Sequence, residues 1–353
     1  MSAALSALPG TLVISLDFEL HWGVRDIHPA EGSYRQVLLA ARDLIPELLR
    51  LFAEFEVAAT WATVGFLFAT SREEIERFSP RVRPAYADPA LDPYSEPVGR
   101  DEGEDPIHYA PSLIRAIRAT PGQEVATHTF SHYYCLEAGQ TKEAFRADLQ
   151  AARAIASKRG VDLRSVVFPR NQYNPAYDEV LISSGITCYR GNQRGWMYRE
   201  STGEMAITRG KRTGRMLDSY LKLSGDTATP WSQVRQPNGL ANVPASAFLR
   251  RYRPRLRRFE ALRLARIRGS MRRAARAKRI YHLWSHPHTF GVRVEENLRF
   301  LRRVLEEFSV CRERYGMRSL SMADVERQVA GVLDHGHGAS TTAPSPPPPL
   351  QLS

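Results

Sequence analysis

Short apolar runs alternate with longer amphipathic stretches along most of the chain. Runs rich in β-branched and aromatic residues predict strands at 11–18, 57–64, 123–127, 163–168, 186–189, 280–284 and 317–320. Apolar positions at helical spacing predict helices at 34–55, 73–78, 141–158, 175–184, 294–315 and 323–332. Pro46 lies inside the first of these helices, where it is expected to kink the helix or split it in two. Strands that alternate with helices in this way predict a parallel α/β architecture.

Two segments depart from this alternation. Residues 80–111 are rich in Pro, Asp, Glu and Gly, which predicts a long excursion over the surface. Residues 336–353 are rich in Pro, Ser and Thr and offer almost nothing to bury, so we expect a disordered tail. The remaining chain, 1–335, is expected to form a single domain.

Composition excludes several classes of protein. Hydrophobic residues make up 43% of the 353 residues and charged residues 25%, which is ordinary for a globular protein with a full core. The sequence has no apolar run of about 20 residues and no N-terminal signal-peptide pattern, so we expect a cytoplasmic protein. Its three cysteines are widely spaced and indicate neither a disulfide framework nor a cysteine zinc site.

The net charge of +11 is concentrated in one segment. Residues 250–279 contain fourteen Arg or Lys and one acid, so the rest of the chain is close to neutral. Their apolar residues are spaced as in an amphipathic helix: Leu256, Phe259, Leu262, Leu264, Ile267 and Met271. This helix could simply pack on the domain, contact an anionic membrane at its inner face, or bind a diphosphate. Sparse aromatic residues make nucleic acid the least favoured partner.

Polar clusters follow four of the predicted strands, and in a parallel barrel the carboxyl ends of the strands meet at one face. The clusters are Asp17 with Glu19, His128 with His132, Arg170 to Tyr173, and His286 with His288. Two histidines four residues apart can bind one zinc-like metal, although hydrogen-bonded histidines at a strand end would give the same pattern.

Each remaining cluster can serve such a site. One of the carboxylates of Asp17 and Glu19 can complete a metal site while the other accepts a proton from water; alternatively, both pair with Arg25 or Arg170. A guanidinium such as that of Arg170 can hold a carboxylate ionised, and His286 can protonate a leaving group. The other histidines are interpreted as structural or exposed, with His288 the main exception: His21, His28, His108, His282 and His288.

These motifs resemble those of the polysaccharide deacetylase family, which is carbohydrate esterase family four with its NodB-homology domain. The family motif H-[S/T]-x-x-H is matched by residues 128–132, and Asp17-Phe18-Glu19 is similar to a D-x-acid variant of its first motif. Arg170 to Tyr173 resembles the motif R-x-P-[Y/F], with Gln172 in place of proline. His286 is similar to the family's late histidine. The resemblance covers about residues 11–330.

The resemblance implies a distorted (β/α) barrel with seven strands, and a hydrolase of carbon–nitrogen bonds other than peptide bonds. It implies that Glu19, His128 and His132 hold a divalent metal, with zinc expected and cobalt or nickel as alternatives. Asp17 would be the base, Arg170 would keep it ionised, the backbone N–H of Tyr173 would stabilise the oxyanion, and His286 would be the acid.

One family motif has no clean counterpart. The family places an acid before a tryptophan to tune the catalytic histidine, but no acid precedes Trp196 within the run that starts at Arg190. Asp218 is one candidate substitute, and the sequence leaves open what replaces the acid.

The expected substrate is an N-acetylated sugar, carried on a nucleotide or a lipid, because a cytoplasmic enzyme cannot reach finished external polymers. Two alternatives stay open. The same barrel could hydrolyse another amide, such as a formamido sugar or a small ureide. A catalytically silent barrel could instead bind a membrane or a polyanion through its basic helix.

Overall fold

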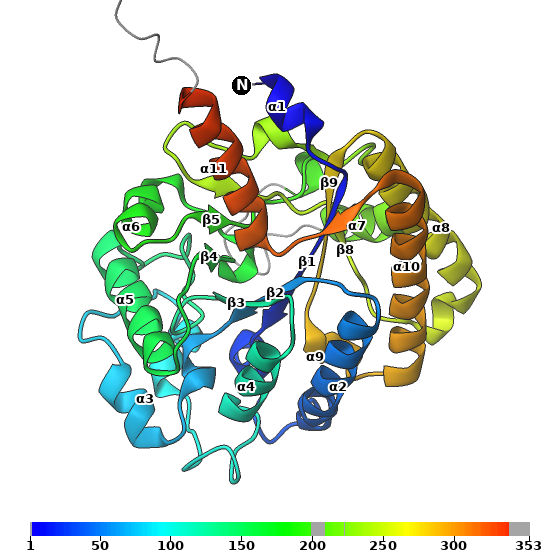
Figure 1. The fold of residues 1–353 in the computed structure, drawn as a ribbon. Coiled ribbons are helices and arrows are strands. Elements are labelled where there is room, and N and C mark those ends of the chain that lie inside the picture. The colour runs from blue at the N-terminus through cyan, green and yellow to red at the C-terminus, as the bar shows by residue number, and fades with distance from the viewer. Residues whose placement is uncertain (1, 199–208, 222, 339–353) are drawn as a thin grey trace, which may run out of the picture.

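A curled sheet of ten strands forms the centre of the molecule, with helices around its outer side (Figure 1). This computed structural model describes residues 2–198, 209–221 and 223–338. The strands are β1 (Thr11–Phe18), β2 (Ala59–Thr63), β3 (Gln123–Thr127), β4 (Ser165–Val166), β5 (Cys188–Tyr189), β6 (Thr229–Pro230), β7 (Ala241–Asn242), β8 (Ala247–Phe248), β9 (Arg279–Ser285) and β10 (Arg318–Ser319).

The strand order is β6-β9-β1-β2-β3-β4-β5-β7, with β10 beside β1 and β8 beside β9. Strands β6 and β9 are antiparallel, and the other strand pairs of the sheet are parallel. Every residue of β1 is buried, as its unbroken apolar run requires for a central parallel strand. The expected α/β barrel is confirmed. It has more strands than the seven predicted because β6, β7 and β8 add three short ones.

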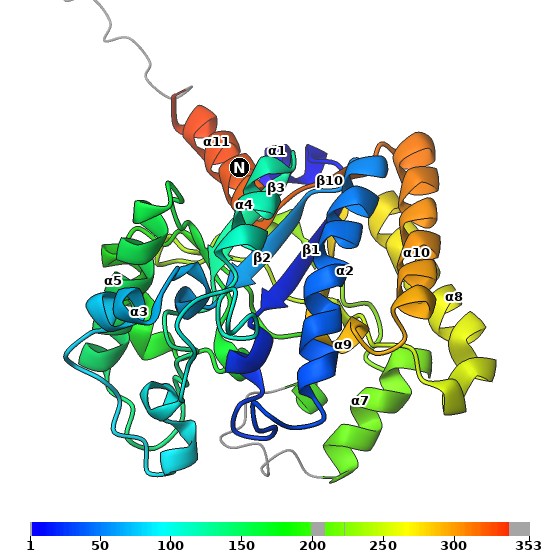
Figure 2. The same cartoon turned by 90° about the horizontal axis from the view of Figure 1, so that it is seen from below.

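The helices are α1 (Ser2–Ala7), α2 (Arg35–Glu54), α3 (Arg72–Phe78), α4 (Pro111–Ala119), α5 (Lys142–Lys158), α6 (Asp178–Ser183), α7 (Arg209–Leu221), α8 (Glu260–Arg276), α9 (Pro287–Phe290), α10 (Val294–Tyr315) and α11 (Met322–Gly338). Helices α2, α10 and α8 lie side by side along one side of the sheet (Figure 2). Among the described residues, no helix combines the length and apolar character needed to cross a membrane.

Three expectations about these segments need correction. Helix α2 is not split at Pro46, because buried side chains on both sides of it, such as Ile45 and Leu48, hold the helix in the core. The segment 80–111 is not only a surface excursion, since Ile107 and Tyr109 are fully buried. Helix α11 includes 336–338, and the rest of the predicted tail lies outside the described residues.

The basic segment is only partly the predicted amphipathic helix. It begins with a 3-10 helix, Pro254–Phe259, and continues as α8. Leu264, Ile267 and Met271 of the apolar stripe are buried, and α8 packs on α10 and β9. Phe259 and Leu262 are instead 52% and 44% exposed. Three of the six stripe residues therefore anchor the helix, two face solvent, and Leu256 is half-buried.

A buried carboxylate joins α3 to α5. Glu74 accepts hydrogen bonds from the backbone N–H of Thr70 at 2.7 Å and from Lys158 Nζ at 2.6 Å, and it also pairs with Arg159. Burial alone raises the pKa of Glu74, but these donors lower it from the ordinary 4.5 to about 2. The ion pair is therefore favourable once Glu74 is ionised.

We expect Glu74→Gln to lower the free energy of unfolding at pH 7 by about 1–2 kcal/mol, allowing for the partly exposed cations. Because the folded pKa lies below the unfolded one, this contribution is complete above pH 4.5 and is lost as the pH falls towards 2. Urea unfolding of both proteins across this pH range measures it. Glu76→Gln, an exposed change on the same helix, is the control; a pH-independent difference for Glu74→Gln would contradict the linkage.

Candidate active site

The site lies at the carboxyl ends of the parallel strands. Glu19 follows β1, His128 follows β3, Arg190 follows β5 and His286 follows β9. Strands β1 and β2 point the same way, and α1 and α11 lie at the opposite end of the barrel (Figure 2). The carboxyl ends of parallel strands bring these side chains to one face of the sheet, as in other α/β barrels.

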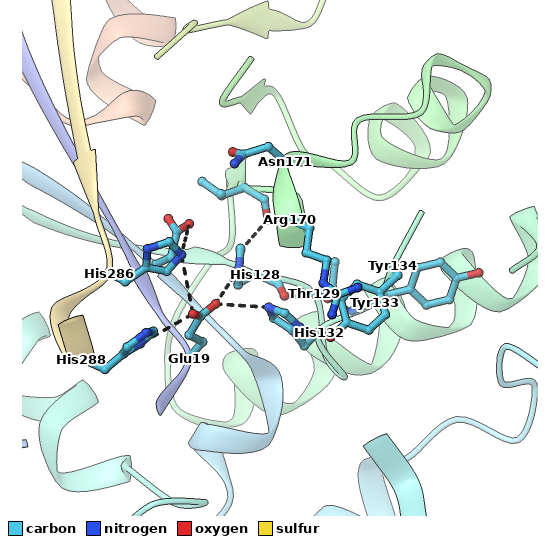
Figure 3. Close-up of polar contacts among 12 residues, drawn as sticks. Glu19, His128, Thr129, His132, Tyr133, Tyr134, Arg170, Asn171, His286 and His288 are labelled. Atoms are coloured by element: carbon cyan, nitrogen blue, oxygen red, sulfur yellow. Dashed lines mark hydrogen bonds and ion pairs between the residues drawn. The ribbon is translucent and has the colours of Figure 1, made fainter. Parts of the chain in front are cut away.

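Four imidazoles surround the carboxylate of Glu19 (Figure 3). Glu19 Oε2 lies 3.3 Å from His128 Nε2 and 3.2 Å from His132 Nε2. Glu19 Oε1 lies 3.6 Å from both His286 Nε2 and His288 Nδ1. Glu19, His128 and His132 are all buried, so their ligand atoms form a compact group that could hold a metal ion.

The loop after β3 fixes the two histidines that flank Glu19 Oε2. His128 Nδ1 lies 2.8 Å from the carbonyl oxygen of Val167, which makes Nδ1 the donor and leaves the Nε2 lone pair facing Glu19. His132 Nδ1 lies 3.2 Å from the hydroxyl of Tyr134. Thr129 and His132 have left-handed backbone angles, with φ of 65° and 58°, which turn the chain so that both rings face inward.

Buried Asp148 on α5 secures the same loop. Its Oδ2 accepts a hydrogen bond from the backbone N–H of Phe130 at 2.7 Å, and its Oδ1 accepts one from that of Ser131 at 3.1 Å. Both donors lie between His128 and His132. The spacing of the two histidines is therefore held by α5 as well as by β3.

Burial sets the charge state of the imidazoles. It lowers the pKa of His132 to about 4, even though the carboxylate of Glu19 opposes the shift, and it lowers that of His288 to about 4. For Glu19, burial alone raises the pKa, but the neighbouring imidazoles hold it well below its ordinary value. Near neutral pH the rings of His132 and His288 are thus neutral and the carboxylate of Glu19 is ionised, which are the forms that bind metals.

Asp17 forms a two-pronged ion pair with Arg190. Arg190 Nη1 and Nη2 lie 2.6 Å and 2.8 Å from the two carboxylate oxygens of Asp17, and both side chains are buried. Burial raises the pKa of Asp17, and Arg190 outweighs it, so the pKa lies below its ordinary value. Asp17 Oδ2 is also 3.6 Å from His286 Nε2. An ionised carboxylate and an imidazole thus lie beside the Glu19 cluster.

A comparison of the amino-acid sequence with known families bears on this site. Residues 37–189, which include His128 and His132, match the sequence model of the polysaccharide deacetylase family. This part of the chain resembles polysaccharide deacetylases. The resemblance is thereby confirmed, and the protein is a polysaccharide deacetylase-like hydrolase that acts on carbon–nitrogen bonds other than peptide bonds. No curated protein matches the chain significantly.

Solved structures of the same barrel cover almost the whole chain. A candidate polysaccharide deacetylase from Mycobacterium smegmatis is 15% identical with a TM-score of 0.57, and the match covers 98% of this chain and 99% of that one. Puue allantoinase is 11% identical with a TM-score of 0.51, covering 91% and 89%. A candidate polysaccharide deacetylase from Pseudomonas aeruginosa PAO1 is 10% identical, with a TM-score of 0.50 and coverage of 90% and 89%. At these identities the likeness shows a shared fold.

The expected role of Arg170 in the deacetylase site is wrong. Its guanidinium pairs with Asp26, lies 3.8 Å from Glu137 and stacks 4.4 Å over the ring of Tyr134. Arg190 pairs with Asp17 instead, and its Nη2 also donates a hydrogen bond to Asn171 Oδ1 at 3.0 Å. Arg190 directly follows a predicted strand, and that signal could have identified it.

The candidate substitute for the missing deacetylase acid is also wrong. Asp218 is buried and forms an ion pair with Arg266. Its carboxylate also accepts hydrogen bonds from the hydroxyls of Ser224 and Tyr198, so it is engaged there and not at His286. Among the described residues, the acids within ion-pair distance of His286 are Asp17 and Glu19. The side chain of Trp196, which marks that motif, lies outside the described residues.

Three further residues singled out in the sequence have different surroundings. The hydroxyl of Tyr173 donates to Asp178 at 2.9 Å, and its ring stacks on Tyr189, so its side chain is engaged outside the Glu19 cluster. Gln172, in the family's proline position, donates to Glu137 at 2.6 Å. His288 lies beside Glu19 in the cluster. It is the main exception among the histidines interpreted from the sequence as structural or exposed.

Proposed function

We propose that this protein is a metal-dependent hydrolase that removes the acetyl group from an N-acetylated sugar. The observation that carries the proposal is the buried cluster of Glu19, His128 and His132 beside the Asp17–Arg190 ion pair. Amide hydrolysis requires a water molecule that is activated for attack and an amide carbonyl that is polarised beside it.

The residues present fit a divalent metal. Two imidazole nitrogens and one carboxylate oxygen are the donor set of a catalytic zinc, with cobalt or nickel as alternatives. Val167 and Tyr134 hold the outer nitrogens of His128 and His132, which is the usual arrangement around metal-bound histidines. Such a metal, when bound, polarises the amide carbonyl and lowers the pKa of water.

The remaining residues divide the proton transfers. Asp17, kept ionised and oriented by Arg190, accepts a proton from the attacking water. His286 lies 3.6 Å from Asp17 and donates a proton to the departing amine. The backbone N–H of Tyr173 is the proposed oxyanion donor, and within the described residues it makes no hydrogen bond.

Four exposed arginines in the segment before α8 favour a substrate that carries phosphate. Arg253, Arg255, Arg257 and Arg258 are exposed and form no ion pair with other described residues. With exposed Phe259 beside them, they suit the diphosphate of a nucleotide- or lipid-linked sugar, or an anionic membrane at the cytoplasmic face. Another amide, such as a formamido sugar or a ureide, is the alternative substrate.

We expect His128→Ala and His132→Ala each to lose one equivalent of metal per chain and to lower acetate release at least about 10³-fold. Elemental analysis of zinc-dialysed protein measures the first, and acid release from free, nucleotide-linked and lipid-linked N-acetyl sugars measures the second. Formamido sugars and ureides complete the panel.

The control is His28→Ala, whose ring stacks on Tyr34 rather than facing Glu19. Unchanged metal content in both cluster variants would overturn the metal mechanism. In that case the silent barrel with a binding function at α8 becomes the better explanation.

A further inference from the structure

A second buried cluster joins the loop after β1 to the segment 80–111. His21 Nδ1 lies 2.8 Å from His108 Nε2, and Glu96 Oε1 lies 3.4 Å from the first nitrogen and 3.6 Å from the second. Both histidines are 1% exposed. The three ligand atoms thus converge on one point, and none of them belongs to the Glu19 cluster.

The outer nitrogen of each ring is held by a separate acceptor. His108 Nδ1 lies 2.6 Å from Asp105 Oδ2, and His21 Nε2 lies 2.8 Å from the carbonyl oxygen of His28. Asp105 is fixed in turn by the backbone N–H of Gly99 at 2.8 Å. Donation of the outer N–H to a carboxylate or a carbonyl, with the inner nitrogen free to bind, is the arrangement found around metal-bound histidines.

The donor set and the charge both suit a divalent cation. Two imidazole nitrogens and a carboxylate oxygen are zinc ligands, and three protein donors leave one coordination position for water. The carboxylates of Glu96 and Asp105 supply two negative charges. The nearby cation, Arg25, donates instead to the carbonyl oxygens of Ala90 and Leu91.

We propose that His21, Glu96 and His108 form a second divalent-metal site, of the zinc class. The site pins the segment 80–111 to the loop that follows Glu19. Trp22 Nε1 donates to the carbonyl oxygen of His108 at 3.0 Å and strengthens the same junction. Glu96 and Trp22 also line a surface cavity of about 370 Å³, so the site lies next to that cavity. The proposal is independent of the proposed catalytic function.

The test uses His132→Ala, which removes the first site and leaves the second unchanged. After dialysis against zinc and removal of loose metal, we expect one equivalent of zinc per chain by elemental analysis. Adding His108→Gln should remove it, whereas adding His28→Ala should not, because only the backbone of His28 contacts the cluster. No zinc in the His132→Ala protein, or zinc that survives His108→Gln, would overturn the proposal.

Because a change at a buried histidine can unfold the protein, Asp105→Asn provides a second variant. It leaves the three ligands in place and removes the carboxylate that orients His108. We expect a roughly 10- to 100-fold weaker zinc affinity in the His132→Ala background, measured by competition with a chromophoric chelator. Circular dichroism verifies the fold, and an unchanged affinity in a folded protein would contradict the assigned geometry.

Discussion

Asp17→Asn should lower turnover about 10³- to 10⁴-fold while the protein keeps its metal, because the change removes the proposed base and leaves the Glu19 cluster in place. The turnover number with the best substrate and the metal content of the same sample measure the effect. Since Arg190 would lose its buried partner, the variant should also be less stable, so turnover is compared at equal folded fractions.

Glu19→Gln is the matched comparison, since it should lose the metal and the activity together. Asp26→Asn is the control, because Asp26 also pairs with an arginine but does so with Arg170, away from Asp17. If Asp17→Asn lost the metal and Glu19→Gln kept it, the two carboxylates would have exchanged roles.

Arg190→Met is expected to cost about 3–5 kcal/mol of unfolding free energy, because it leaves the carboxylate of Asp17 buried and uncompensated. It should also move the acid limb of the pH–rate profile to higher pH. Burial raises the pKa of Asp17, and without Arg190 nothing of similar strength opposes it, so a higher pH is needed to ionise the base. Urea unfolding and kcat/KM against pH measure the two effects.

Arg170→Met serves as the comparison for Arg190. Arg170 is 18% exposed in its ion pair, and it contacts Asp26 rather than Asp17. We expect a smaller loss of stability and an unmoved acid limb. A shifted limb in Arg170→Met with none in Arg190→Met would restore Arg170 to the role that the family motif implied.

The barrel itself could be predicted because its main elements carry long periodic patterns. The strand at 11–18 and the helix at 294–315 have the predicted bounds in β1 and α10, and each buries a continuous apolar run or stripe. The short strands β6, β7 and β8 have two residues each, and they form only because distant strands supply their partners. A period cannot be recognised in two residues.

The convergence of Glu19, His128 and His132 was also predictable, because parallel topology fixes where strand ends meet. The choice between Arg170 and Arg190 was not. Both follow predicted strands. The backbone at Arg170 and Asn171 is left-handed, with φ of 52° and 54°, and in this turn Arg170 pairs with Asp26 while Arg190 pairs with Asp17.

The cluster of His21 and His108 was missed for a related reason. The two residues are 87 positions apart, and His108 belongs to a segment whose composition indicated an exposed excursion. Its burial depends on packing against the loop after β1, and no local pattern records such packing.

The left-handed backbone conformations in the site loops lower the stability of the fold while they position side chains of the site. Of the eight non-glycine residues with positive φ in the described chain, five lie in these loops: Leu20, Thr129, His132, Arg170 and Asn171. Each such conformation costs roughly 1 kcal/mol, which the surrounding barrel must offset. A selection for heat resistance alone would therefore favour glycine at these positions. At His132 that change would delete a proposed metal ligand, and at Thr129 it would loosen the loop that holds His128 and His132.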